Sequence, residues 1–345
     1  RATSANRSDM ASITSIIYQG CDNGEMNTPE TTSSPPEQQL NPAQQAVVEQ
    51  LGARLEERPL FAEDLRHHLR SALETAVEPL IETLPPGQDL FLAKHQLGQL
   101  HGCQTRYLHE QEQEFVWAVN IARGSIVHKA VELAINWRRE IEPPVIIDEV
   151  LARYEQDSSS LGDWLQGCTE VERAELRSES LDAFTKYLEC WPPLRPAWRP
   201  VSESRLRSEL CGGRLILSGR ADLTLGVAEG HRAGKVIIDL KTGNFSPLHT
   251  EDLRFYALIE ALRIGVPPRL LASYYLDSAH FVPEAVTEDL LMATVARVAD
   301  AAAIYMDLIH HKIAPTTSAG PQCRWCDLAE TCETGRSFLE EQPSW

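Results

Sequence analysis

The spacing of hydrophobic residues predicts helices from Leu40 to about Leu100. In "FAEDLRHHLRSALETAVEPLIETL" apolar residues recur at steps of three and four, which is typical of one face of an amphipathic helix. These positions are Leu65, Leu69, Leu73, Val77 and Leu80. An earlier helix is predicted in "NPAQQAVVEQLGARL", with Asn41 as its N-cap and Pro42 at its first position. Residues 122–140 and 145–191 show further helical patterns.

A period of two replaces the helical period in "RLILSGRADLTLGV", residues 214–227. One face of this predicted strand is expected to carry Gly219, Ala221, Leu223 and Leu225, and the other Arg220, Asp222 and Thr224. Two more strands are predicted in "GKVIIDLKTG" and "RLLASYYLD", with the helix "EDLRFYALIEALRIG" between them and a long helix over residues 287–312. Because strands and helices alternate, the predicted fold class is α/β, a mixed central sheet flanked by helices.

Four regions follow from these patterns. Residues 1–39 are rich in Ser, Thr, Asn, Pro and Glu and lack apolar periodicity, so we expect a disordered leader. Residues 40–198 form a predicted helical region, residues 199–312 an α/β core, and residues 313–345 a tail that contains three cysteines.

The composition is that of a globular protein, with 43% apolar and 24% charged residues among 345. No run reaches 18 apolar residues, and no basic segment with an apolar stretch begins the chain. We therefore expect a cytoplasmic protein without a membrane partner. The formal net charge of -18 argues against nucleic acid as a partner, but residues 195–241 contain nine basic residues against five acidic ones, so a local site is compatible with it.

Asp239 and Lys241 interrupt the apolar strand "VIIDLKTG". Residues two apart leave the same face of a strand, so both side chains are expected beside each other while Leu240 points into the core. Asp222 on the preceding strand can lie opposite Asp239, and two neighbouring carboxylates favour a divalent cation such as Mg²⁺ between them. The lysine could then orient a water and offset charge on a phosphate. A structural ion pair between Asp239 and a neighbouring arginine, with Lys241 in solvent, is the alternative.

Four motifs in this order resemble the RecB-type branch of the PD-(D/E)XK nuclease superfamily. "GSIVHKAVE" resembles its early Gly-x-x-x-His helix, "GRADL" its Gly-Arg-x-Asp strand, and "IDLKTG" its Asp-x-Lys strand. "DLRFYALIEAL" is similar to its Gln-x-x-x-Tyr helix. The resemblance spans roughly residues 95–335 and implies a restriction-endonuclease-like core.

The resemblance implies a role for particular residues of this sequence. The metal ligands would be His128, Asp222, Asp239 and the carbonyl of Leu240. Lys241 would be the catalytic lysine, and Tyr256 would face substrate or brace the site. The chain departs from the family pattern at Asp252, which occupies the glutamine position and places an anion near the expected phosphate. Glu132 and Glu203 are secondary candidates near the site.

The tail sequence "CRWCDLAETC" provides Cys323, Cys326 and Cys332 at metal-binding spacing, and Cys103 is the best candidate for a fourth ligand. Zn²⁺ is compatible with this spacing. The pattern also resembles the iron-sulfur members of the same nuclease family, including the AddB nuclease domain and the CRISPR-associated exonucleases. That resemblance implies a structural [4Fe-4S] cluster.

Two functions follow as hypotheses. The first is a Mg²⁺- or Mn²⁺-dependent DNA nuclease, an exonuclease or a flap- or end-processing enzyme that acts on single strands or ends in DNA repair or recombination. The alternative is a catalytically weak or inactive DNA-binding or assembly subunit of a helicase-nuclease system, which the overall acidity and Asp252 favour. A helicase partner is expected by analogy with the family only.

Overall fold

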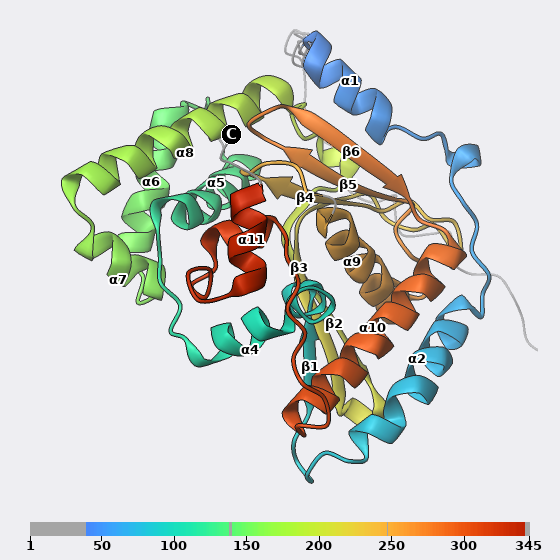
Figure 1. Ribbon diagram of the computed structural model, residues 1–345. Coiled ribbons are helices and arrows are strands. Elements are labelled where there is room, and N and C mark those ends of the chain that lie inside the picture. The colour runs from blue at the N-terminus through green and yellow to red at the C-terminus, as the bar shows by residue number, and fades with distance from the viewer. Residues whose placement is uncertain (1–38, 138–139, 247, 342–345) are drawn as a thin grey trace, which may run out of the picture. The chain divides into compact units, whose positions relative to one another are not determined.

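The core of the protein is a six-stranded mixed sheet (Figure 1). The computed structural model describes residues 39–137, 140–246 and 248–341, so nearly all of the predicted leader lies outside the described residues. The strands are β1 (Leu90–Ala93), β2 (Val201–Leu210), β3 (Leu215–Leu225), β4 (Val236–Lys241), β5 (Leu270–Tyr275) and β6 (His280–Ala285). This arrangement confirms the predicted α/β class with a mixed sheet.

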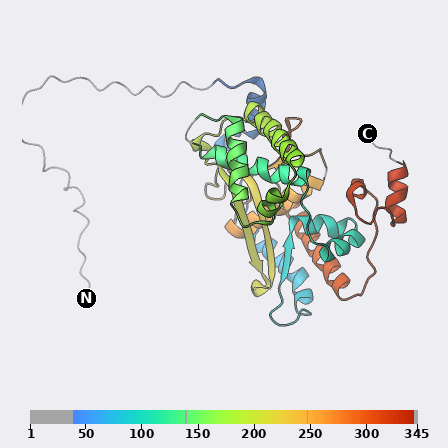
Figure 2. The same ribbon diagram turned by 90° about the vertical axis from the view of Figure 1, so that its left-hand side faces the viewer.

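Two groups of helices cover the sheet. The helices are α1 (Pro42–Leu51), α2 (Leu65–Ile81), α3 (Lys94–His101), α4 (Gln104–Glu112), α5 (Val119–Ile135), α6 (Pro143–Glu155), α7 (Ser160–Gly167), α8 (Glu170–Cys190), α9 (Leu248–Ile264), α10 (Glu288–Ile309) and α11 (Glu333–Glu341). One hydrophobic cluster joins the sheet to α2, α9 and α10. A second cluster joins its other face to α1 and α5–α8. Figures 1 and 2 show how these helices are arranged around the sheet. No helix in the described part of the chain is long and apolar enough to cross a bilayer.

The strongest local patterns are confirmed. Asn41 caps α1 through a capping box with Gln44, and the strands and helices predicted after residue 213 all form. The prediction was wrong at residues 90–93, which form β1 instead of helix. A run of four apolar residues is too short to distinguish the two periods. Because β1 joins the same sheet as the later strands, residues from Leu40 onward form one unit.

Two different strands, β1 and β4, pair with separate parts of one edge of β3. β2 pairs antiparallel with nearly all of β3, so β1 and β4 share the opposite edge. β1 runs parallel to residues 215–218, and β4 runs antiparallel to residues 223–225. The carboxyl ends of β1 and β4 therefore point toward each other across residues 219–222. This gap is where the polar side chains described below meet.

The predicted alternation along β3 changes face inside this gap. Ala221 belongs to the cluster with α9, whereas Leu223 and Leu225 belong to the cluster with α5, so the expectation that all three share one face was wrong. Opposite Asp222, the β2 residue Glu203 has φ 51° and the ladder skips it. A non-glycine residue in the left-handed region breaks regular pairing and redirects the strand.

Candidate active site

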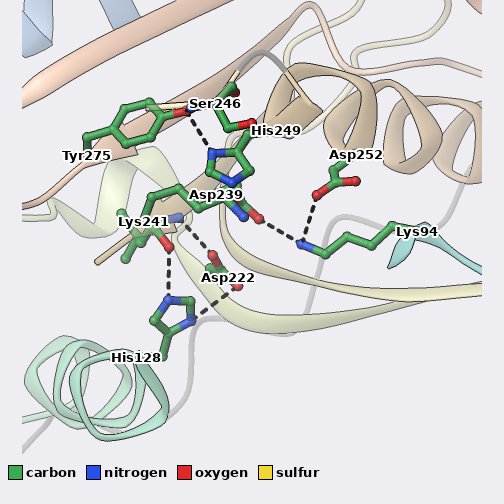
Figure 3. A network of polar contacts seen from close by, with 10 residues as sticks. Lys94, His128, Asp222, Asp239, Lys241, Ser246, His249, Asp252 and Tyr275 are labelled. Atoms are coloured by element: carbon green, nitrogen blue, oxygen red, sulfur yellow. Dashed lines mark hydrogen bonds and ion pairs between the residues drawn. The ribbon is translucent and has the colours of Figure 1, made fainter. Parts of the chain in front are cut away.

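Asp239 is buried and lies between two lysines at the end of β4 (Figure 3). Its Oδ1 is 3.1 Å from Lys94 Nζ, and its Oδ2 is 2.5 Å from Lys241 Nζ. Burial alone would raise the pKa of Asp239, but Lys241 and Lys94 outweigh burial and hold the pKa below its ordinary value. Asp239 is therefore an anion at neutral pH, and its partners are lysines rather than the arginine of the structural alternative.

Asp222 and His128 meet at the backbone of Leu240. The amide of Leu240 donates to Asp222 Oδ2 over 2.7 Å, and His128 Nε2 lies 2.9 Å from the Leu240 carbonyl oxygen. His128 Nδ1 is 3.4 Å from Asp222 Oδ1. The structure thus brings together the imidazole, the carboxylate and the carbonyl that the sequence predicted as neighbours (Figure 3).

His128 is held in place by contacts that residues near the start of α5 make with the strand ends. Arg123 Nη1 donates to the Thr242 carbonyl over 2.8 Å, and Nη2 pairs with Asp277 at 2.5 Å. Both partners follow the carboxyl ends of parallel neighbours, β4 and β5. A Cβ added at Gly124 would lie 3.5 Å from the Thr242 side chain, so the helix approaches the strand ends closely. Four residues after Gly124, about one turn further along α5, His128 is directed at the Leu240 carbonyl.

Glu203 completes a set of donor atoms with His128 and Asp222. One donor atom from each of the three lies within 4.8 Å of the others. This bound is close to the largest separation, about 4.4 Å, between two ligands that each lie about 2.0–2.2 Å from one divalent cation. The left-handed backbone at Glu203 and a contact of 2.7 Å with Arg220 Nε direct this carboxylate to the site. Glu203 was only a secondary candidate from the sequence, which gives no sign of the unusual φ.

Asp239 is not part of this three-residue set in the described part of the chain. Its two oxygens face the lysines instead. The donors that fit a cation most directly are therefore His128, Glu203 and Asp222, with the Leu240 carbonyl in contact with the imidazole. Glu132, the other secondary candidate, pairs with Lys129 at 2.9 Å on the surface of α5.

Lys94 is a member of the site that the sequence analysis missed. It follows β1 directly, and its ammonium lies 4.0 Å from Asp252 Oδ2 and 5.2 Å from the centre of the Tyr256 ring. A reader of the sequence could have found it only by recognising "LFLA" as a strand that ends at the gap in the sheet. Lys94 supplies a counter-charge to Asp252, the residue that departs from the family pattern.

Tyr256 is buried and braces the site from α9. A Cβ at Gly219 would lie 2.2 Å from the Tyr256 ring, so only glycine allows the ring to pack on β3 within the gap. His249, also unpredicted, places Nδ1 2.8 Å from the Tyr275 hydroxyl. Burial and Lys241 lower the pKa of His249 to about 4, so this imidazole is neutral at pH 7.

Replacing Asp252 with asparagine is expected to stabilise the protein at neutral pH. Burial raises the pKa of Asp252 to about 6, although Lys94 and Lys241 oppose the shift. An unfolded aspartate titrates near 3.9. The protonated Asp252 is thus favoured by folding. Its contribution to the free energy of unfolding is fully present below about pH 4 and is lost as the pH rises through about 6. Asp252→Asn should gain about 1–2 kcal/mol at pH 7.5 and little at pH 4.5.

Urea denaturation at the two pH values measures this difference. Asp182→Asn on the exposed surface of α8 is the matched control. Its effect on the free energy of unfolding should be the same at both pH values. An Asp252→Asn protein that is less stable than wild type at pH 7.5 would show that the pair with Lys94 outweighs the burial of the carboxylate.

The four predicted cluster cysteines line one cavity. Cys103 precedes α4, and the tail contributes Cys323, Cys326 and Cys332. Burial raises the pKa of the Cys326 thiol, Arg106 lowers it, and the neighbouring Cys103 and Cys323 raise it further. The Gly335 amide donates to Cys332 Sγ over 3.3 Å. Residues separated by more than 200 positions in the sequence therefore converge on one point.

Comparison with known proteins identifies the superfamily of the chain. The family model for the PD-(D/E)XK nuclease superfamily matches residues 92–333. Among solved structures, the chain is similar to SSO0001, with 13% identity and a TM-score of 0.33 over 77% of this chain and 96% of that chain. It is also similar to a candidate exonuclease from Eubacterium rectale, with 9% identity and a TM-score of 0.42 over 74% of this chain and 89% of that chain. No curated protein sequence matches the chain.

The structural likenesses are low in identity and TM-score, so the assignment rests on the family match. That match covers well over half of the chain. It also includes the whole polar network at the gap between β1 and β4, from Lys94 to Asp252. The protein therefore belongs to the PD-(D/E)XK nuclease superfamily.

Proposed function

We propose that this nuclease is a Mg²⁺- or Mn²⁺-dependent deoxyribonuclease that trims single strands or ends, as an exonuclease or a flap-processing enzyme, in DNA repair or recombination. The observation that carries the proposal is the convergence of donor atoms from His128, Glu203 and Asp222 beside the Asp239–Lys241 pair. The excess of basic residues between 195 and 241 supports a polyanionic substrate in an otherwise acidic chain.

The residues around the gap have separate roles in this proposal. His128, Glu203 and Asp222 would hold the ion, which when bound lowers the pKa of a water and stabilises charge on a phosphate oxygen. Lys241 would orient the attacking water and stabilise the charge that develops on the phosphate. Asp239 holds the Lys241 ammonium in place through its contact of 2.5 Å. Lys94 neutralises Asp252, so an incoming phosphate meets a balanced pair instead of an isolated anion.

We also propose that Cys103, Cys323, Cys326 and Cys332 hold a structural [4Fe-4S] cluster. Four thiols around one cavity match the donor set that such a cluster needs. The hydrogen bond from the Gly335 amide to Cys332 Sγ is the kind of contact that stabilises a thiolate ligand. The same four residues also suit Zn²⁺. Iron and zinc analysis of protein purified without oxygen distinguishes the two.

A cleavage assay tests the proposed activity. Labelled single-stranded, duplex and flap DNA, together with single-stranded RNA, are incubated with the purified protein and Mg²⁺ or Mn²⁺, and again with EDTA. We expect metal-dependent shortening of the single-stranded DNA and of the DNA ends. Absence of cleavage of every DNA substrate with either metal would overturn the proposal, and preferential cleavage of RNA would replace the substrate class.

Asp252 is the observation that favours the alternative function. An aspartate where the family has glutamine suits a subunit that holds DNA, with a helicase as its partner, and cuts it slowly. Tight binding of DNA ends with no metal-dependent product would support this alternative. If Asp252→Asn then restores cleavage, the loss of activity is explained by this one residue.

The affinity for Mn²⁺ is expected to rise with pH. Burial alone would lower the pKa of His128, but Asp222, Asp239 and Glu203 outweigh burial and raise the pKa to about 9. Without metal, the imidazole therefore keeps its proton at pH 7, and a cation that binds its nitrogen must displace this proton. Affinity should rise by up to about tenfold per pH unit below about pH 9.

Isothermal titration with Mn²⁺ from about pH 6.5 to 8.5 measures this slope, and buffers of different ionisation enthalpy count the protons released. His128→Gln removes the titrating ligand and should flatten the dependence on pH. An affinity that stays constant over this range in the wild type would show that His128 does not bind the ion.

A further inference from the structure

A second cavity, of about 370 Å³, lies at the other end of β4 from Lys241. Val236, the first residue of β4, lines it, together with the loop that follows α1. Asp239 is three residues further along the strand, or about 10 Å away at the usual rise. This volume is within the range of cavities that bind small ligands. The cavity is distinct from the nuclease site.

Three arginines and one acid line this cavity: Arg58, Arg199, Arg269 and Glu229. The only ion pair among them in the described part of the chain joins Arg58 to Glu229 at 4.0 Å, and the Glu229 side chain is 59% exposed. A surplus of positive charge in a partly buried cavity is less costly when an anion balances it. The surplus is unusual in a chain with a net charge of -18.

Arg269 is anchored with part of its guanidinium unused. Its Nη2 donates to the Leu51 carbonyl at the end of α1. Its Nε is buried and has no hydrogen-bond partner within the described residues. Burial lowers the pKa of Arg269, and the neighbouring charge of Arg58 lowers it further. Arg58 lines the same cavity, and its Nε donates to the Ala53 carbonyl over 3.4 Å. The remaining N–H donors of two guanidinium groups in one cavity are suited to a phosphate, which accepts bonds from both.

The wall behind Arg58 is built by two backbone segments in close contact. A Cβ at Gly234 would lie 2.0 Å from the Val227 carbonyl oxygen and 3.2 Å from Arg58 Nη1. A Cβ at Gly226 would lie 2.5 Å from the Gly234 carbonyl oxygen. Glycine at both positions lets the segments cross and leaves room for the Arg58 head group. The cavity is therefore a consequence of the fold.

Trp198 lines the same cavity, and the Arg195 guanidinium lies 5.9 Å from the centre of its ring. The Trp198 backbone carbonyl accepts from the Gly226 amide over 2.6 Å, which fixes this residue against the wall. The exposed Arg199 follows it with φ 49°, and no ion pair or side-chain hydrogen bond of Arg199 occurs within the described residues. An aromatic ring in one cavity with several guanidinium groups is a combination that suits a base stacked on the ring and a phosphate held by arginine.

We propose that this cavity binds a nucleoside phosphate, with the phosphate on Arg58 and Arg269 and the base against Trp198. The same chemistry has two sources, a free nucleotide or the terminal nucleotide of a strand. Because binding here does not require cleavage, the proposal does not depend on the proposed deoxyribonuclease activity.

Equilibrium binding in EDTA tests the proposal, because the nuclease site then lacks its ion. The probes are AMP, adenosine, inorganic phosphate, and a short oligonucleotide with or without a 5′-phosphate. We expect AMP to bind more tightly than adenosine or phosphate. Arg58→Gln and Arg269→Gln each remove one charge-assisted contact. Each should therefore weaken AMP binding by about tenfold or more. Trp198→Ala should weaken AMP binding but leave phosphate binding unchanged.

Arg153→Gln, an exposed arginine on α6 paired only with Glu149 within the described residues, is the matched control. Circular dichroism identifies any variant that does not fold, and the partly exposed Arg58 makes Arg58→Gln the safer of the two changes. A 5′-phosphorylated oligonucleotide that outcompetes AMP identifies a strand end as the ligand, and AMP binding without competition identifies a free nucleotide. Equal binding of all probes by wild type, Arg58→Gln and Arg153→Gln would overturn the proposal.

Discussion

Replacing Lys241 with methionine should slow DNA cleavage by about 10²–10³-fold. The substitution removes the ammonium group that lies 2.5 Å from Asp239 and keeps an unbranched apolar stem of similar length. Asp239 retains Lys94 at 3.1 Å, so the buried carboxylate keeps a counter-charge and the fold should persist. Single-turnover cleavage at saturating Mn²⁺ measures the effect on the chemical step separately from substrate binding.

The exposed Lys312, which pairs with Asp307 on the surface, provides the control. Lys312→Met makes the same chemical change away from the site and should cleave at the wild-type rate. Mn²⁺ affinity should remain close to that of wild type in both variants, because neither lysine is a ligand. If Lys241→Met cuts within a few-fold of wild type, the lysine has no part in the chemistry and the proposed mechanism fails.

If the proposed cluster is present, replacing Cys103 with serine should remove it and destabilise the protein by several kcal/mol. A link between Cys103 and Cys323 closes about 220 residues, which corresponds to about 5 kcal/mol in the chain-entropy treatment of cross-links. The tail should then separate from α4, because the hydrogen bonds that join them within the described residues are those of Gln104 and Thr105 with Thr316 and Thr317. Visible absorption and anaerobic urea denaturation follow the two effects together.

Cys168→Ser is the matched control, since Cys168 lies at the end of α7 and does not line the cysteine cavity. It should alter neither the spectrum nor the midpoint of unfolding. Protease digestion adds a local measurement, because loss of the cluster should expose the segment between α10 and α11 to cleavage. A Cys103→Ser protein with wild-type metal content and stability would show that Cys103 is not a ligand.

The pairing of Lys94 with Asp252 gives a physical reason for the departure from the family motif. An aspartate at this position is costly by itself, and its raised pKa reflects burial. The ammonium of Lys94, 4.0 Å away, offsets part of this cost. Because Lys94 also contacts Asp239, a change at Asp252 should alter the environment of Lys241, which pairs with the same carboxylate.

The sequence by itself determined the periodic elements and the residues with chemistry. Helical spacing identified α2 and its buried face, and the period of two identified β3. The interval between Asp239 and Lys241 placed both on one face of β4, because side chains alternate along a strand. The order of the motifs brought His128, Asp222 and Lys241 into one hypothesis, and the structure places them in one network (Figure 3). These features depend on residues near one another in the chain.

Only the tertiary structure decided which distant groups face one another. β1 gives no periodic signal in four residues, yet its pairing with β3 brings Lys94 to Asp239. The left-handed backbone of Glu203 is imposed where the ladder between β2 and β3 is interrupted. The cavity of Arg58 and Arg269 joins segments more than 200 positions apart. Such contacts follow from how strands and helices pack together, which local spacing cannot encode because the same pattern suits many pairings.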